Sequence, residues 1–157
     1  VESCPRYRPL MYLLDTNVVS VRAPTKAVQD RVTLEWMRDA SDHLYLSVVT
    51  ALEVEKGIAR LQRSGGDKKA AMLGQWWMAV EEEYGERLLP FDLKAARSAG
   101  RIADRARAFS PDFRDVAIAA IAETCGLVVI TFNQRHFEPL GVPFLNPLNG
   151  LPDHRRR

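Results

Sequence analysis

Three carboxylates and one amide lie just after expected strands or at the starts of expected helices, and they are the residues best suited to chemistry. Asp15 follows an apolar run that opens at Met11, and Asn133 comes just after another apolar run. Glu53 and Asp115 each lie at the start of an expected helix, just beyond a strand or loop. Open α/β folds bind ligands at the carboxyl ends of parallel strands. The four side chains could therefore converge on one rim.

A cluster of carboxylates implies a cation. Neighbouring carboxylates repel one another unless they share a proton or bind a divalent ion, and hard oxygen ligands suit Mg²⁺ or Mn²⁺. Such an ion can bind a phosphate oxygen and orient a water for in-line attack on a phosphodiester, so nucleic-acid hydrolysis is the expected chemistry. Zinc is disfavoured, because the three histidines show no paired spacing and no cysteine joins them.

Helix capping is the competing interpretation of every one of these residues. Asp and Asn are common at strand ends and as N-caps. Thr50 and Glu53 have the spacing of a capping box. Asp112, one helical turn before Asp115, is better suited to the N-cap than to a water-mediated contact with a metal, and Arg114 could pair with an acid or phosphate. Three more polar residues suit either capping or the orientation of metal ligands: Thr16, Asn17 and Thr131.

Strands and helices alternate along the chain. β-rich or apolar runs predict strands at residues 11–14, 44–48, 87–91, 127–131 and 141–147. Helical periodicity or caps predict helices at residues 25–40, 50–64, 67–84, 92–108, 113–124 and 134–137. Without tight hairpin signals, this order predicts an α/β fold: a three-layer α/β/α domain with a mostly parallel sheet of about five strands.

Two of the expected helices have one face with a distinct residue pattern, apolar in the first and cationic in the second. In helix 25–40 the residues expected to face the sheet are Val28, Val32, Trp36 and Met37. In helix 92–108 one face carries the cations Lys94, Arg97, Arg101 and Arg105. That face could follow a phosphate backbone, although a solvated surface is the better interpretation of any single arginine.

Size and composition indicate one ordinary globular domain. The chain has 157 residues, 46% hydrophobic and 27% charged, with a net charge of +2 that decides nothing about nucleic acid. We expect a single domain over residues 11–147, an N-terminal extension without a structural role at 1–10, and a mobile, polar, basic tail at 148–157. Cys4 and Cys125 form no disulfide framework or metal motif, which favours the cytoplasm. Neither a signal peptide nor a membrane segment is expected.

Four sequence blocks together resemble the signature of the PIN domain, in the form found in VapC and FitB type toxins of bacterial toxin–antitoxin pairs. The blocks are residues 13–20, 47–58, 115–120 and 129–133. The resemblance extends from Met11 to about Pro147, nearly the whole chain. Each block is weak evidence alone, but their shared order and spacing make the resemblance specific.

The resemblance implies a Mg²⁺ or Mn²⁺ dependent endoribonuclease that is inhibited by a small DNA-binding antitoxin. It implies that Asp15 and Asp115 are the principal metal ligands and Glu53 the second acid. It also implies a homodimer, and contact with operator DNA only through the antitoxin. Asn133 stands where many members have a fourth acid, so the site would carry three negative charges and a second metal is disfavoured. The approach to Asp115 also lacks the glycine often found there.

Two other classes of α/β protein do not match the residues around Asp15. A haloacid dehalogenase type phosphatase needs a second Asp two residues after the first, where this chain has Asn17. A dinucleotide-binding fold needs a glycine-rich first turn, which is absent after Asp15. The remaining alternative is a non-catalytic PIN-fold protein that binds nucleic acid within a regulatory complex, and the three retained acids argue against it.

Overall fold

A parallel five-stranded sheet forms the centre of the molecule, as the sequence predicts. The structure is a computed structural model that describes residues 10–26 and 30–154. The strand order is β3-β2-β1-β4-β5, and every neighbouring pair is parallel. The strands are β1 (Tyr12–Leu14), β2 (Leu44–Ser47), β3 (Leu88–Leu89), β4 (Val128–Ile130) and β5 (Phe144–Leu145).

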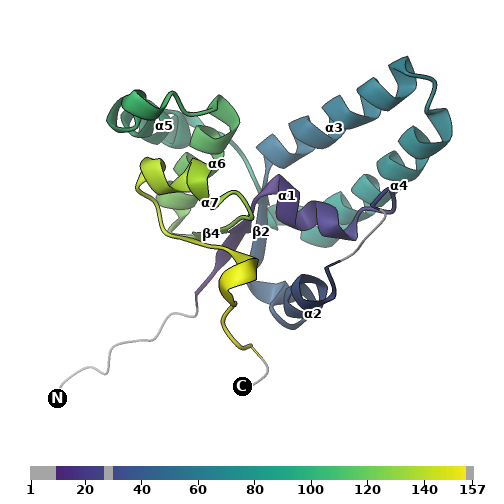
Figure 1. Cartoon of the computed structure of the whole chain (residues 1–157), viewed down its shortest axis with the longest axis horizontal. Helices are drawn as coiled ribbons and strands as arrows, with labels where there is room; N and C mark the ends of the chain where they lie inside the picture. Colours follow the sequence, from purple (N-terminus) through teal and green to yellow (C-terminus); the bar gives the residue numbers. More distant parts are fainter. Residues whose placement is uncertain (1–9, 27–29, 155–157) are drawn as a thin grey trace.

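Helices cover both faces of the sheet and make three layers. The helices are α1 (Thr16–Val19), α2 (Arg31–Asp39), α3 (Val48–Arg63), α4 (Asp67–Tyr84), α5 (Leu93–Arg105), α6 (Phe113–Cys125) and α7 (Gln134–Phe137). Figure 1 shows α5, α6 and α7 on one side of the strands and α2 and α4 on the other, with α3 and α4 forming a long antiparallel pair. Within the described residues, no helix is both long and apolar enough to cross a bilayer.

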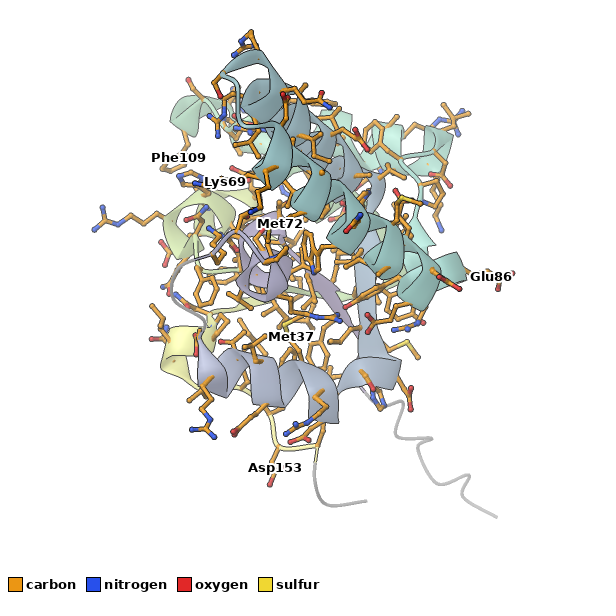
Figure 2. All side chains as sticks on the ribbon, turned by 90° about the vertical axis from the view of Figure 1, so that its right-hand side faces the viewer. Met37, Lys69, Met72, Glu86, Phe109 and Asp153 are labelled. Atoms are coloured by element: carbon orange, nitrogen blue, oxygen red, sulfur yellow. The ribbon has the colours of Figure 1, made fainter. Side chains whose placement is uncertain are left out.

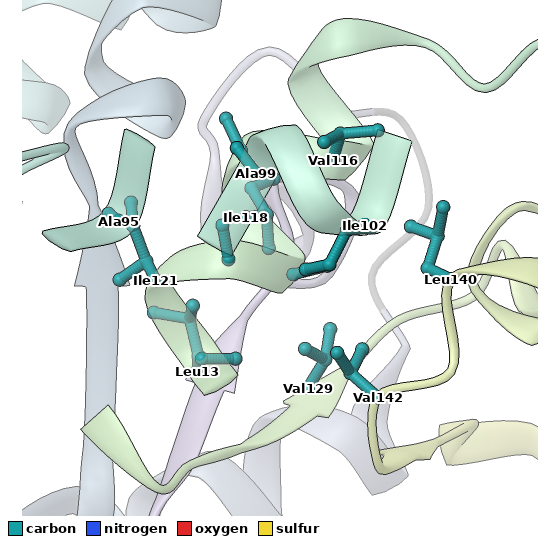
Figure 3. Close-up of a cluster of buried hydrophobic side chains, with 14 of the residues drawn as sticks. Leu13, Ala95, Ala99, Ile102, Val116, Ile118, Ile121, Val129, Leu140 and Val142 are labelled. Carbon is teal, nitrogen blue, oxygen red and sulfur yellow. The ribbon is translucent and has the colours of Figure 1, made fainter. Parts of the chain in front are cut away.

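The central strand separates two hydrophobic cores. Side chains alternate across a strand, so Leu13 enters one cluster while Tyr12 and Leu14 enter the other. All three are fully buried. Figure 3 shows the first cluster, in which Leu13 and Val129 lie beneath the helices α5 and α6.

Small residues bring α5 and α6 close together. Ala95, Ala99 and Ile102 of α5 are buried against α6, where every residue from 116 to 122 is buried. The caps follow the sequence-based expectation. Asp92 Oδ1 accepts from Ala95 N at 2.9 Å at the start of α5, and Gly126 ends α6 with φ of 68°.

Two predictions about the helix expected at residues 25–40 are wrong: where it begins, and which way Val32 faces. Helix α2 begins at Arg31 rather than at residue 25, because Asp30 is the N-cap and accepts from Thr33 N at 3.2 Å. Trp36 and Met37 face the sheet as expected, and Figure 2 shows Met37 directed inward. Val32 does not: it is 73% exposed, because it lies on the opposite face from the buried stripe. Val28 lies outside the described residues.

Arg105 and the C-terminal segment, both expected to face solvent, make hydrogen bonds with the rest of the domain. Arg105, the last member of the expected cationic face on α5, donates to Leu140 O and pairs with Glu123 at 3.3 Å, so it does not belong to a free track. Part of the expected C-terminal tail, residues 148–154, also contacts the fold. Trp36 Nε1 donates to Pro152 O at 2.9 Å, and His154 Nε2 lies 3.2 Å from Tyr12 Oη. Residues 1–9 and 155–157 lie outside the described part.

Candidate active site at the carboxyl edge of the sheet

Asp15 is fixed at the carboxyl end of the central strand. Its backbone N donates to Ile130 O at 2.9 Å, so it continues the pairing of β1 with β4. The residue is only 5% exposed. Oδ1 accepts from Thr16 N at 2.7 Å and Oδ2 accepts from Thr131 Oγ1 at 2.7 Å. Asp15 therefore caps α1, as the helix-capping interpretation predicts. It also places a buried carboxylate at the edge of the sheet.

The end of β4 is organised by one hydroxyl. Thr131 Oγ1 donates to Asp15 and also accepts from Asn133 N at 2.9 Å. Nearby, Asn17 Oδ1 accepts from Phe132 N at 3.4 Å. Asn133 precedes α7, but its side chain makes no capping bond. The polar residues Thr16, Asn17 and Thr131 thus hold three parts of the site in place: Asp15, Glu53 and the turn after β4.

Glu53 does not belong to a capping box. Helix α3 begins at Val48, immediately after β2, so Thr50 lies inside the helix rather than at its N-cap. Glu53 Oε1 instead accepts from Thr16 Oγ1 at 3.0 Å, and Thr16 Oγ1 lies 3.1 Å from Thr50 Oγ1. This contact across 37 residues of sequence turns Glu53 toward Asp15.

Asp115 approaches the same edge from the first turn of α6. Its Oδ2 lies 3.0 Å from His136 Nδ1, a residue of α7. Sequence reasoning considered His136 only as a zinc ligand and missed this contact. The available signal was its position three residues after Asn133, in the short helix that begins at the sheet edge.

Asp112 and Arg114 form a charged pair beside the carboxylates. Asp112 is the N-cap of α6, as predicted, and its Oδ1 accepts from Arg114 N at 2.8 Å. The Arg114 guanidinium bonds both Asp112 carboxylate oxygens at 3.0 Å and lies 3.6 Å from Glu53 Oε2. These contacts hold the pKa of Asp112 at about 2 and raise the pKa of Arg114 above its usual range.

The four candidate residues line one cleft of about 350 Å³. The whole lining is Asp15, Thr16, Asn17, Ser20, Lys26, Glu53, Asp112, Arg114, Asp115, Asn133 and His136. Its residues lie at the end of β1, in and after α1, in α3, at the start of α6, in the turn after β4 and in α7, so the parallel sheet brings distant segments together. Ser20 and Lys26 were not foreseen, because neither stands at a strand end.

The electrostatics of the cleft favour a bound cation. Burial raises the pKa of Asp15 from 3.8 to about 6; repulsion from Asp115 and Glu53 adds to the rise, and bonds from Thr131 and Thr16 oppose it. Burial also raises the pKa of Asp115, against the effect of His136. A positive ion between these carboxylates would stabilise their charged forms.

The oxygen donors in the cleft fit Mg²⁺ or Mn²⁺. Among the described residues, no three His, Cys, Asp or Glu side chains are grouped closely enough to enclose an ion. Mg²⁺ does not require such a cage, since it is commonly held by one or two carboxylates and keeps several waters. Asp15 and Asp115 supply two carboxylates to the lining of one cleft, so the chemistry of the donor set suits this ion.

Comparison with known proteins gives the family. The model of the PIN domain matches residues 12–141, and the chain belongs to this family. The VapC ribonuclease Y4jK of Sinorhizobium fredii is 34% identical over 141 residues, which are 87% of this chain and 97% of that protein. The predicted resemblance is therefore confirmed.

Solved structures agree in fold over nearly the same length. FitAcB from Neisseria gonorrhoeae has a TM-score of 0.76 at 29% identity, covering 88% of this chain and 99% of that one. DNA-bound VapBC from Salmonella typhimurium has a TM-score of 0.62 at 28% identity, covering 87% and 98%.

Proposed function

We propose that this protein is a Mg²⁺ or Mn²⁺ dependent endoribonuclease and the toxin of a cytoplasmic toxin–antitoxin pair. The observation that carries the proposal is the buried Asp15 carboxylate, which faces Glu53 and Asp115 in one cleft and has a pKa raised to about 6. Burying a carboxylate beside two others is unfavourable without a partner charge. A cation-dependent reaction gives this arrangement a use.

Asp15 and Asp115 are the residues that would hold the ion, with Glu53 as the second acid. Thr131 and Thr16 orient Asp15 and Glu53 through short hydrogen bonds, so the oxygens are positioned before substrate arrives. When bound, the ion would polarise a phosphate oxygen and lower the pKa of a water. Asn133 adds a neutral amide that can orient this water.

Arg114 is placed to contact the phosphate. Its guanidinium lines the cleft and lies 3.6 Å from Glu53 Oε2. Arginine presents a rigid fork that matches phosphate oxygens. A phosphodiester entering the cleft would compete with Glu53 and Asp112 for this guanidinium.

RNA as the substrate is supported by a cationic face that leads into the cleft. Lys56, Arg60 and Arg63 project from successive turns of α3. With Arg114, Glu53 and Gly57 they line a neighbouring hollow of about 280 Å³. Glu53 and Arg114 belong to both hollows. A nucleic-acid backbone could follow this cationic face of α3 to the carboxylates.

The partners are proposed from the relatives. The solved neighbours include VapBC bound to DNA and FitAB bound to a DNA fragment. By analogy we expect a small DNA-binding antitoxin to inhibit this protein and to provide the contact with operator DNA. We also expect a homodimer, because three large apolar side chains are exposed within the first two turns of α3, α5 and α6.

The decisive experiment measures cleavage of single-stranded RNA by purified protein freed of any partner. Asp15→Asn and Asp115→Asn should each reduce cleavage at least about a hundredfold, the scale of removing a group that stabilises the transition state. Excess EDTA should abolish the activity and Mn²⁺ or Mg²⁺ should restore it. Glu55→Gln is the matched control, because Glu55 is exposed on α3 outside the cleft lining.

The same assay distinguishes the non-catalytic alternative. Wild-type protein that binds RNA but leaves it intact in both ions would support a binding protein of the PIN fold. Full cleavage by either aspartate variant would refute the assigned roles.

A further inference from the structure

A second hollow adjoins the carboxylate cleft and has a different character. Its volume is about 320 Å³, and it shares Asp112, Asp115 and His136 with the cleft. The rest of its lining combines an aromatic ring, two prolines, a serine and a cation: Phe109, Pro111, Pro139, Ser110 and Arg135. It therefore offers flat apolar walls next to the site where a phosphodiester would be held.

Phe109 is the least expected member of this lining. Its side chain is 69% exposed and belongs to neither of the two hydrophobic clusters formed by the described residues. It ends the short 3-10 turn Arg107–Phe109, and Figure 2 labels it at the margin of the molecule. Exposing a phenyl ring to water gives no folding benefit.

The backbone beside Phe109 is also unusual. Ser110 has φ of 46°, and it is the only non-glycine residue in the described part of the chain with positive φ. The left-handed conformation is unfavourable for a serine. Such residues persist where a particular geometry is needed, and here the turn sets the direction of the chain between Phe109 and Pro111.

We propose that this second hollow binds the nucleobase next to the scissile phosphate, with Phe109 as the stacking platform. The inference rests on the proposed ribonuclease function. A nucleobase is the occupant that fits, because single-stranded RNA offers flat π-faces that stack on aromatic rings and that are joined to phosphates. Asp115 and His136 border both hollows, so a base here lies beside a phosphate in the cleft.

The proposal also gives the RNA a path. On one side of the carboxylates, the cationic face of α3 contacts the backbone; on the other side, Phe109 contacts a base. Arg135 lies in the second hollow, where it can stack on the base or pair with its phosphate. Phe109 is thus a substrate-positioning residue that does not touch the reacting atoms.

The first test measures binding and does not depend on cleavage. Single-stranded oligouridylate, whose bases stack weakly on one another, carries 2-aminopurine at each position in turn and is added to the Asp15→Asn protein, and stacking is detected as fluorescence quenching. One position should be quenched. Adding Phe109→Ala should remove the quenching and weaken RNA binding by about tenfold, the usual scale for one base stack. Phe109→Trp should keep both, and Met78→Ala, which removes another exposed side chain that lines neither hollow, should change neither.

The second test uses cleavage. Once the cut site in a long RNA is mapped, an abasic nucleotide is placed on each side of it. One abasic substrate should lose about tenfold in kcat/KM with wild-type protein. Phe109→Ala should lose the same factor on intact RNA and nothing further on that abasic substrate, with a rise in KM rather than a fall in kcat.

The outcomes separate the two proposals. If wild-type protein cleaves no RNA but Phe109-dependent quenching is seen, the ribonuclease function fails and the base site stands. If RNA is cleaved but quenching survives in Phe109→Ala, or the abasic and Phe109→Ala effects multiply independently, the base site is refuted.

Discussion

Thr131 and Asp15 are 116 residues apart in sequence, yet Thr131 Oγ1 donates to Asp15 Oδ2 across 2.7 Å in the buried end of the sheet. The bond joins the ends of β1 and β4, which are neighbouring parallel strands. Because Thr131 Oγ1 also accepts from Asn133 N, one hydroxyl fixes the orientation of a proposed metal ligand and the turn that follows β4.

Replacing Thr131 by valine tests this relationship while preserving side-chain shape. The bond from Thr131 lowers the pKa of Asp15, so its loss should raise that pKa further and weaken Mg²⁺ binding. The Asn133 N–H also loses its acceptor. Asn133 is exposed, so water can replace this bond and the free energy of unfolding should fall by about 0.5–1.5 kcal/mol, the scale of one ordinary hydrogen bond. Calorimetric titration with Mg²⁺ and thermal unfolding measure the two effects. Thr124→Val, at a residue that is outside the cleft lining and donates to backbone oxygens within α6, should leave Mg²⁺ affinity unchanged.

Asp15→Asn should stabilise the metal-free protein at neutral pH. The pKa of Asp15 is about 6 in the folded protein, against 3.8 for an ordinary carboxyl. The free energy of unfolding is therefore unaffected by this group below about pH 4, and it decreases as the pH rises from 4 through 6. A neutral side chain avoids this decrease in the free energy of unfolding, which amounts to roughly 3 kcal/mol at 1.36 kcal/mol per pKa unit. Denaturant unfolding in EDTA should show the advantage of the variant growing between pH 4 and 7 and then levelling. An advantage that is the same at pH 4 and pH 7 would contradict the burial argument.

Much of this architecture can be predicted from local sequence. The apolar run before Asp15 and the run before Asn133 can be buried only as central strands, and the alternation of strands with helices requires parallel pairing. Parallel pairing then brings Asp15, Glu53 and Asp115 to one edge. These inferences need only periodicity, caps and the geometry of the α/β fold.

The contacts that local sequence could not predict involve partners that are distant in sequence. Glu53 matches a capping box locally, but its actual partner is Thr16, 37 residues away. Arg105 resembles a solvated cation until the fold brings Leu140 O to it. The C-terminal segment packs because Trp36 donates to Pro152 O, 116 residues away. Periodicity cannot supply such contacts.

Stabilisation by Mg²⁺ should depend on pH. Metal binds the carboxylate form of Asp15, so protons compete with the ion below about pH 6, near the pKa of this group. At a fixed ionic strength, the rise in Tm caused by Mg²⁺ should be clear at pH 8 and small at pH 5. In Asp15→Asn the rise should be nearly absent at both values. Equal rises at pH 5 and pH 8 in the wild-type protein would show that the ion binds elsewhere.

Charge reversal on α3 should weaken RNA binding. Lys56→Glu with Arg60→Glu replaces two cations of the hollow that adjoins the carboxylate cleft. Each lost phosphate contact should reduce the salt dependence of single-strand binding by about 0.7 in the log–log slope. Fluorescence anisotropy at several salt concentrations measures this. Arg97→Glu on α5 is the matched control, since Arg97 lies in none of the hollows that border the cleft; a loss equal to that of the α3 variants would place the backbone on α5.

The exposed apolar side chains at the starts of α3, α5 and α6 should form the homodimer interface. Leu52, Leu93 and Phe113 are 59%, 66% and 68% exposed. The Glu53–Arg114 ion pair brings the starts of α3 and α6 together. Phe91 lies just before α5, and its ring centroid is 5.9 Å from that of Phe113. Large grouped apolar surfaces are commonly covered by a partner. Light scattering should therefore find a dimer for wild-type protein and a folded monomer for Leu93→Arg. Val32→Arg, on the equally exposed face of α2, should remain dimeric, and a dimer that survives Leu93→Arg with Phe113→Arg would place the interface elsewhere.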